Sequence, residues 1–313
     1  MTTTELNAAA SGRALTARGR GGRRSASERG RLSGWLFLLP ALVFYGLFVL
    51  WPLFATVQYS FFDWDGYTTA TPVGLGNYVR VLTDPQLISS VGHSFFLMIF
   101  FTIIPVVLGL VIAALIQEIR LKGLATTART LLFLPQIIPG AAAAIAWVWM
   151  LSSTGAVNQL LSGIGLGGLT RAWLGDFTWA LPAVGLIGLW LNLGFCTILL
   201  MAGIGKIDLA IYEAAKLDGA GFFQTFRSVT LPGLRQEIGV CVTMTMIAAL
   251  ASFDVVYMST RGGPGTSTMV PGVQIFQLAF TESRVGLASA LAIVLTVLIV
   301  VVIVPLQRLF QEK

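Results

Sequence analysis

A segment in the second half of the chain combines charged and very small side chains in a way that suits docking onto another protein. It reads EAAKLDGAGFFQTFRSVTLPGL and spans residues 213–234. Its paired alanines, Ala214 and Ala215, would leave one face of a helix almost bare. Three charged residues stand beside them: Glu213, Lys216 and Asp218. A short helix of this kind fits the groove of a partner protein, and an ordinary amphipathic surface loop is the alternative interpretation.

The same stretch predicts two short helices joined by a turn. Asp208 can cap a helix that runs through Asp218, because an aspartate in this place accepts hydrogen bonds from free backbone N–H groups. The run Gly219-Ala220-Gly221 permits a tight turn, since glycine adopts positive φ without strain. A second helix over about 222–229 follows. We expect Pro232 in the first turn of the next apolar helix, where its missing N–H costs little.

Residues that could perform catalysis or hold a cofactor are sparse. The sequence has no G-x-x-x-x-G-K-[ST] motif for ATP, no H-E-x-x-H motif and no paired cysteines at zinc spacing. Its one histidine, His93, has no partner at metal-ligand spacing. A membrane-embedded enzyme should show paired ionisable residues inside apolar runs, and Asp254 is the single candidate. We therefore expect no catalytic residue, no metal site and no bound cofactor.

The composition places the chain in a membrane. Of its 313 residues, 56% are hydrophobic and 11% are charged, whereas a soluble domain carries roughly 25% charged residues. The mean hydropathy is +0.82. Because about 20 apolar residues cross the hydrocarbon core as a helix, six runs predict an all-α protein with six transmembrane helices. These runs cover about 34–60, 89–117, 128–152, 179–204, 237–258 and 285–307.

The distribution of basic residues predicts the orientation. Sixteen of the 20 Lys and Arg residues fall on one side of the predicted spans, and cytoplasmic segments carry this excess. We therefore expect both termini and the segment 205–236 inside the cell. Residues 1–32 are rich in arginine and poor in apolar residues, so a disordered cytoplasmic tail is expected there. Because membrane orientation explains the positive charge, we expect no binding of nucleic acid.

Several motifs resemble those of one transporter family. Glu213-Ala214-Ala215, then Gly219, then Leu231-Pro232 resemble the EAA motif of ABC-importer permeases. Three further patches resemble the carbohydrate permeases of the maltose/glycerol-phosphate type: GLGNYVRVLTDPQL (74–87), the third predicted span with its exit (134–161) and SFDVVYMSTRGGPGTST (252–268). The resemblance covers about residues 33–310.

Two departures from the family pattern are visible. The family often has a proline shortly before the EAA helix, where this chain has Lys206-Ile207-Asp208, and we expect only a changed geometry on approach to that helix. Arg261 interrupts the glycine run of the T-x-G-G-P pattern at a tolerant position.

The resemblance implies a role for the charged segment. Residues 33–313 would form an importer transmembrane domain, and its loop 205–236 would hold a coupling helix that docks into a cleft of a cytoplasmic ATPase. The residues implied in this coupling are Glu213, Ala214, Ala215, Asp218, Gly219, Ala220, Leu231 and Pro232.

The resemblance also implies partners. Two ATPase copies would bind ATP and Mg²⁺, a second and different permease chain would complete a heterodimer, and an extracytoplasmic solute-binding protein would deliver a sugar. The expected location is the cytoplasmic membrane of a bacterium, crossed several times.

A sugar requires hydrogen-bonding groups and an aromatic face. The fourth predicted span offers Trp190 and Asn192, and the fifth offers Ser252, Asp254 and Tyr257. About 17 residues of continuous helix would place Asp254 some ~26 Å from the start of the fifth span, near its outer mouth. A polar residue at the membrane interface is the alternative interpretation of Asp254.

Two other functions stay open at this point. One is an importer for another polar solute, such as glycerol phosphate, which would favour arginines along the pathway. The other is a membrane-embedded enzyme acting on a lipid-linked substrate, which would need no ATPase partner.

Overall fold

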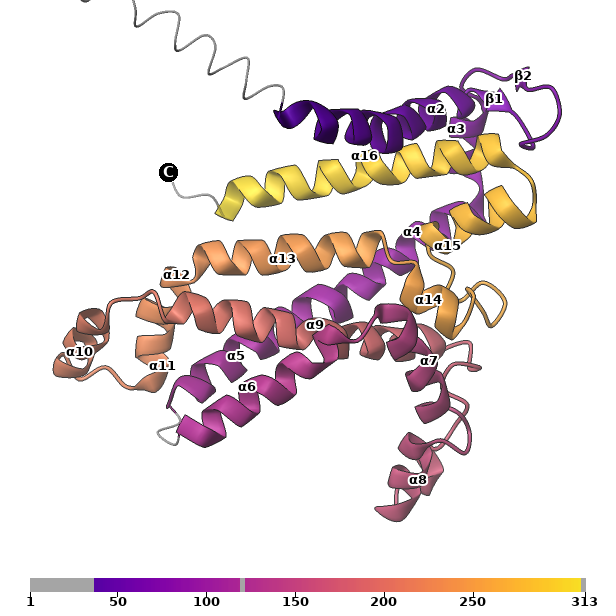
Figure 1. The fold of residues 1–313 in the computed structure, drawn as a ribbon. Coiled ribbons are helices and arrows are strands. Elements are labelled where there is room, and N and C mark those ends of the chain that lie inside the picture. Colours follow the sequence, from indigo (N-terminus) through magenta and orange to yellow (C-terminus); the bar gives the residue numbers. More distant parts are fainter. Residues whose placement is uncertain (1–36, 119–121, 311–313) are drawn as a thin grey trace, which may run out of the picture. The chain divides into compact units, whose positions relative to one another are not determined.

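The computed structural model describes residues 37–118 and 122–310, and almost all of its regular structure is helical (Figure 1). The chain divides into two units between Ala55 and Thr56. An apolar helix over Phe37–Tyr59 crosses that division and contains the π-helical turn η1 (Gly46–Leu50) and α2 (Trp51–Tyr59). The predicted tail over 1–32 lies outside the described residues.

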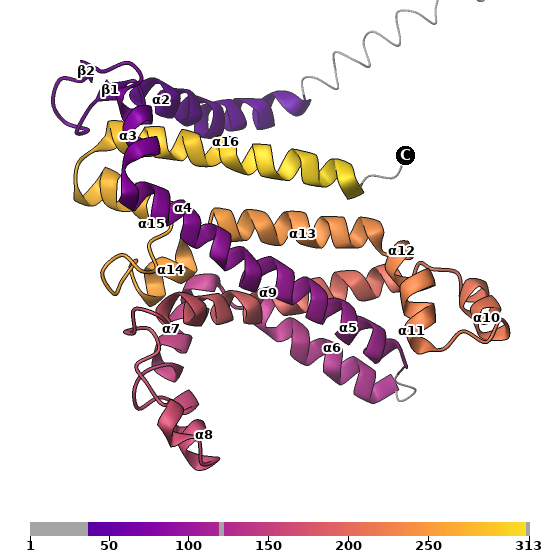
Figure 2. The same cartoon turned by 180° about the vertical axis from the view of Figure 1, so that it is seen from behind.

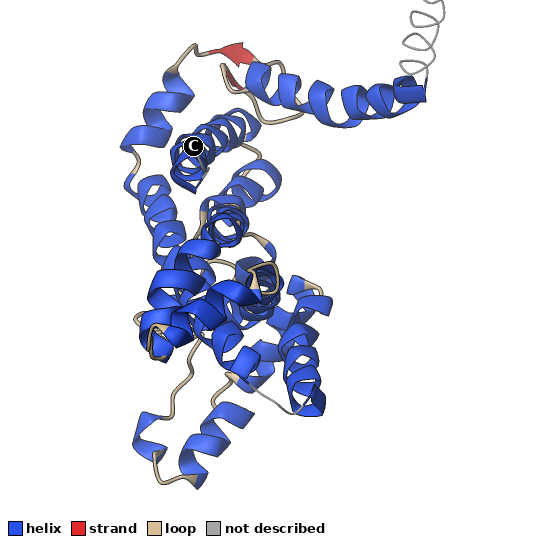
Figure 3. Ribbon diagram, turned by 90° about the vertical axis from the view of Figure 1, so that its left-hand side faces the viewer, coloured by secondary structure: helices blue, strands red, loops and turns tan. Residues whose placement is uncertain are grey.

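The second unit begins with a small hairpin and a long helix. Strands β1 (Phe62–Asp63) and β2 (Thr71–Pro72) pair antiparallel, and they are the only strands in the described ranges (Figure 3). After α3 (Gly76–Thr83), the elements α4 (Pro85–Met98), η2 (Ile99–Ile103) and α5 (Ile104–Glu118) follow without interruption. Within them, Pro85–Gln117 is a 33-residue apolar helix that covers the second predicted span.

The third predicted span is not one straight helix. It consists of α6 (Lys122–Ile137) and α7 (Gly140–Met150), and the chain bends by 101° between the two helices. Pro139 stands at the break with an extended backbone. Proline removes a helical hydrogen bond and disfavours helical geometry in the residue before it. The predicted span over about 128–152 therefore corresponds to a pair of helices with a break between them.

The fifth predicted span is also broken. Helix α13 (Arg235–Leu250) has 16 residues, about 24 Å at the helical rise, which is shorter than the ~30 Å hydrocarbon core. Helix α14 (Asp254–Ser259) follows three residues later. At this break the chain is crowded, because a methyl group on Gly272 would lie 2.7 Å from the Ser252 carbonyl oxygen. The expectation of one helix over 237–258 is wrong.

Helices α9 (Ala180–Ile204) and α16 (Val285–Phe310) are long, apolar and unbroken, and they coincide with the fourth and sixth predicted runs. Helix α9 is central, since it contacts α5, α6 and α13, and both opposite views show it between them (Figures 1 and 2). Among the described residues, the structure has four helices long enough to cross a membrane, or five if the bent pair counts as one.

The remaining elements connect these helices. On the side of the β hairpin lie α15 (Pro271–Phe276) and the π-helical turn η5 (Gln277–Thr281), which pack on α16. The segment between α7 and α9 contains α8 (Ala156–Gly163) and the 3-10 turn η3 (Gly167–Leu169). Between α9 and α13 lie α10 (Leu209–Leu217), α11 (Phe222–Thr225), the π-helical turn η4 (Phe226–Thr230) and α12 (Leu231–Gly233).

Candidate functional site

Residues 205–236, called the docking loop below, extend beyond the ends of α9 and α13 (Figure 1). Its first helix, α10, starts as predicted. The Asp208 carboxylate accepts a hydrogen bond of 3.0 Å from the Ala210 N–H, so it satisfies one of the free donors at the helix start. Glu213, Ala214 and Ala215 follow in the middle of this helix.

The end of α10 explains the need for Gly219. The Ala220 N–H donates to the Ala215 carbonyl at 2.9 Å, and the Gly219 N–H donates to the Lys216 carbonyl at 3.1 Å. These two bonds form the Schellman motif, which requires a left-handed residue just after the helix cap. Gly219 has φ +78° and Asp218 is the cap. The chain therefore turns back sharply at Gly219, as predicted.

One face of α10 is free in the described structure. Glu213, Ala214, Asp218 and Gly219 are exposed, whereas Ala215 and Ala220 are half-buried. Leu217, at the tip, is 89% exposed. This exposed tip, together with the bare surface at Ala214, is accessible to a second protein.

The return arm differs from the expectation in one respect. The predicted second helix over 222–229 exists as α11 followed by the π-helical turn η4. Leu231 and Pro232, both exposed, lie in the short helix α12. Leu234 interrupts the helical geometry before α13 begins at Arg235. Pro232 is thus not in the first turn of α13, and this prediction is corrected.

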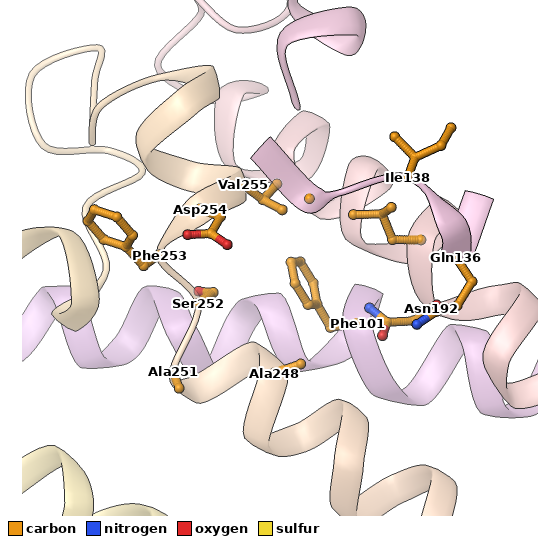
Figure 4. Close-up of a pocket in the computed structure, with 12 residues that line it drawn as sticks. Phe101, Gln136, Ile138, Asn192, Ala248, Ala251, Ser252, Phe253, Asp254 and Val255 are labelled. Atoms are coloured by element: carbon orange, nitrogen blue, oxygen red, sulfur yellow. The ribbon is translucent and has the colours of Figure 1, made fainter. Parts of the chain in front are cut away.

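A cavity of about 420 Å³, called the central cavity, lies where both broken helices meet α9 (Figure 4). The break between α6 and α7 contributes Gln136 and Ile138, and the break after α13 contributes Ser252 and Asp254. Its other lining residues are Phe101, Gly140, Leu191, Asn192, Ala248, Ala251, Phe253 and Val255. Its volume is typical of ligand pockets, which span roughly 300–1,000 Å³.

Polar groups of this cavity have unused hydrogen-bonding capacity. The buried Ser252 hydroxyl has no hydrogen-bond partner among the described residues, and a buried hydroxyl without a partner is costly. The Asn192 amide donates to the Gly188 carbonyl at 2.8 Å, one helical turn away. Asp254 is exposed to the cavity at the start of α14. Asp254 was expected about 17 residues along one continuous helix. In the structure it lies beyond a break in that helix, at the start of α14.

The two other predicted substrate residues do not line the cavity. Trp190 packs edge-on against Trp147, with ring centroids 5.8 Å apart. Tyr257 stacks on Phe253 at 5.0 Å. The structure thus brings together Asn192, Ser252 and Asp254, and it places Trp190 and Tyr257 in aromatic packing around them.

Sequence reasoning missed the aromatic rings and the amide that do line the cavity. Phe101 belongs to η2 and is 4% exposed. Its ring fits against α9 because Gly188 has no Cβ, which would collide with it. Phe253 and Gln136 lie at the helix breaks. The proline pair Pro135 and Pro139 was the available signal for Gln136, because prolines mark a probable interruption.

No group of three or more His, Cys, Asp or Glu side chains within 37–118 and 122–310 could hold a metal ion. His93 makes a 2.8 Å hydrogen bond with the Met269 carbonyl. The structure thus offers a polar cavity between broken helices and a separate exposed helix, an arrangement that suits a membrane transport protein.

Comparison with known proteins identifies the family. Residues 106–313 match the model of the binding-protein-dependent transport system inner membrane component. The chain belongs to this family. It is 36% identical to the probable ABC transporter permease YurN of Bacillus subtilis over 273 residues, 87% of this chain and 93% of YurN.

Two further proteins are similar along most of their length. The trehalose/maltose transport system permease MalF of Thermococcus litoralis is 34% identical over 275 residues, 85% of this chain and 89% of MalF. A crystal structure of a bacterial ABC transporter involved in alginate import matches with a TM-score of 0.78 and 25% identity. This match covers 91% of this chain and 97% of that one.

Proposed function

We propose that this chain is the permease subunit of an ABC importer that takes up a sugar or an oligosaccharide. The observation that carries this proposal is the central cavity, lined by both helix breaks. Broken membrane helices that surround a polar cavity are typical of transporter substrate sites. Relatives named for trehalose/maltose and alginate transport support a carbohydrate as the substrate.

The lining favours a neutral polar solute over a phosphate. The residues around the central cavity include Asp254 and no Lys or Arg, and a carboxylate repels a phosphate. Ser252, Asn192 and Gln136 can exchange hydrogen bonds with sugar hydroxyls. Phe101 and Phe253 provide the apolar faces on which a sugar ring can pack.

The proposed topology has six spans, with each broken pair, α6/α7 and α13/α14, counted as one. Both termini and the docking loop face the cytoplasm of a bacterial cell. Supporting this orientation, the loop and the tail carry much of the positive charge of the chain, and cytoplasmic segments are enriched in Lys and Arg.

The proposed assembly contains two different permease chains, two ATPase copies and an external solute-binding protein. Each ATPase copy presents one groove, and this chain supplies one docking loop. When the ATPases close on ATP, α10 and the corresponding helix of the second permease chain move together, and the permease chains rotate so that the cavity opens on the other side. Such rigid-body movement is a common form of switching.

Reconstitution of the full complex tests this proposal. Uptake and ATP hydrolysis are measured in proteoliposomes across a panel of mono- and oligosaccharides, each delivered with the binding protein. At least one sugar should stimulate both activities. A chain that co-purifies with no P-loop ATPase, or whose complex transports no sugar in the panel, would contradict it.

A further inference from the structure

The two ends of the docking loop are packed directly against each other. A methyl group on Gly203, near the end of α9, would lie 2.6 Å from Leu234 Cδ2 and 2.7 Å from Glu237 Cγ. On the returning arm of the loop, a methyl group on Gly233 would lie 2.7 Å from Ile207 Cδ1. Leu234 is fully buried. The end of α9 and the start of α13 therefore cannot approach more closely without rearrangement.

An ion pair joins the same two ends. The Lys206 ammonium lies 2.9 Å from Glu237 Oε1. The Glu237 side chain is 11% exposed, whereas that of Lys206 is 73% exposed. Of the two ion pairs within the described ranges, the other joins Arg284 to Glu282, in a different segment.

The position of Glu237 makes Lys206 its specific partner. Glu237 lies in the first turn of α13, where the helix dipole favours a negative charge. Its carboxylate is nevertheless largely removed from water, so loss of Lys206 would leave a charge poorly compensated. The neighbouring Arg235 points elsewhere, since its guanidinium donates to the Leu309 carbonyl at the end of α16.

A second contact ties α10 to the return arm. The Tyr212 hydroxyl and the Thr230 hydroxyl form a hydrogen bond of 3.1 Å, and Thr230 is 5% exposed. This contact holds the middle of the loop, whereas the ion pair holds its base. The exposed residues Glu213 and Ala214 take part in neither contact, so they stay free for a partner.

The three residues Lys206, Ile207 and Asp208 stand where the resembling family often has a proline. A proline would stiffen the approach to α10 by fixing φ. In this chain, side-chain contacts restrain residues 206–208 instead. Lys206 forms the ion pair, and Asp208 caps α10.

We propose that Lys206 and Glu237 are positioning residues that lock the base of the docking loop. With the base locked, a displacement of α10 is passed on to α9 and α13, both of which reach the central cavity or its break. With the base released, part of that displacement is absorbed within the loop. This inference rests on the proposed function, because it requires a partner ATPase that moves α10.

The test compares Lys206→Met, Glu237→Gln and Lys206→Arg in the fully reconstituted complex. Sugar uptake and ATP hydrolysis are measured in the same proteoliposomes, and their ratio is the readout. In Lys206→Met and Glu237→Gln, ATP hydrolysis continues while the ratio falls about tenfold, within the roughly 5- to 150-fold usual for coupling between sites. Lys206→Arg keeps the ion pair and should keep the ratio within about twofold of the wild type on the same scale.

The matched control is Arg227→Met. It removes a positive charge from an exposed position of the same loop, where the described structure has no ion pair. Its ratio should equal that of the wild type. A purely structural role of the ion pair would lower the amount of assembled complex without changing the ratio per complex.

Three results would overturn the inference. They are an unchanged ratio in both Lys206→Met and Glu237→Gln, an equal loss in Lys206→Arg, and failure of both neutral variants to assemble while Arg227→Met assembles. Failure of the proposed function would look different, because the wild-type complex itself would then show no ATP-driven uptake.

Discussion

The turn after α10 offers the sharpest test of how the docking loop works, through the substitution Gly219→Ala. Gly219 has φ +78°, and a methyl group there would have no atom within 4 Å. The substitution therefore introduces no collision, and its cost is the backbone strain of an L-residue in left-handed geometry, about 1–2 kcal/mol. A cost of this size corresponds to a factor of roughly 5–30 in the population of the turn.

Gly221 provides a matched control two residues away. A methyl group on Gly221 also has open space around it, but its φ is −74°, which any residue adopts. Gly221→Ala should leave uptake unchanged. Gly219→Asn should recover part of the loss, because asparagine tolerates left-handed geometry better than alanine.

The assay is sugar uptake per ATP hydrolysed in proteoliposomes containing the complete complex. Gly219→Ala should lower this ratio by up to about 5–30-fold, the full loss of the turn population. Equal ratios in Gly219→Ala and Gly221→Ala would refute the argument, because the backbone geometry of this turn would then be irrelevant to coupling.

Three further predictions concern the cavity, the packing and the outer hairpin. Asp254→Ala and Asn192→Ala should each weaken the apparent affinity for sugar, by about 0.5–1.5 kcal/mol per lost hydrogen bond, as measured by sugar-stimulated ATP hydrolysis. Gly188→Ala should lower the thermal stability of the purified chain by about 1–3 kcal/mol, because its methyl group overlaps the Phe101 ring. Hydrogen bonds from Thr68 and Tyr67 hold the pKa of Asp65 below its usual 3.8. Their stabilising effect on this turn is therefore complete above that value and is lost as the pH falls through the lowered pKa, which amide hydrogen exchange can follow.

Each of these predictions has its own control. Trp190→Phe should leave the affinity for sugar unchanged, because Trp190 packs on Trp147 outside the cavity lining. Gly92→Ala should not destabilise, since a methyl group there meets nothing within 4 Å. Asp65→Asn should remove the pH dependence of its turn. Unchanged sugar affinity in both cavity variants would contradict the proposed substrate site.

Features set by neighbouring residues could be predicted from the sequence. The cap at Asp208 and the left-handed turn at Gly219 depend on hydrogen bonds that reach at most five residues along the chain. The apolar runs that became α9 and α16 were equally visible, because length and hydropathy alone identify such helices.

Features set by distant contacts could not be predicted. The break after Leu250 has no proline. It lies where the backbone of Gly272 comes so close to the Ser252 carbonyl that a Cβ would not fit. The Lys206–Glu237 ion pair joins residues 31 positions apart. Phe101 lines the cavity and Trp190 does not. This difference depends on how η2 packs against Gly188. In each case tertiary packing decides between several locally acceptable arrangements.

Chemical cross-linking from the exposed face of α10 tests the central claim most directly. Ala214→Cys places a reactive thiol there, and the native Cys196 and Cys241 are fully buried. In the assembled complex, a short reagent with a maleimide at one end and a photoreactive group at the other should join Ala214→Cys to the ATPase subunit, whereas Thr69→Cys in the hairpin loop should give no such product. If Ala214→Cys reacts with a small maleimide but never becomes linked to an ATPase, α10 does not dock there and the account is contradicted.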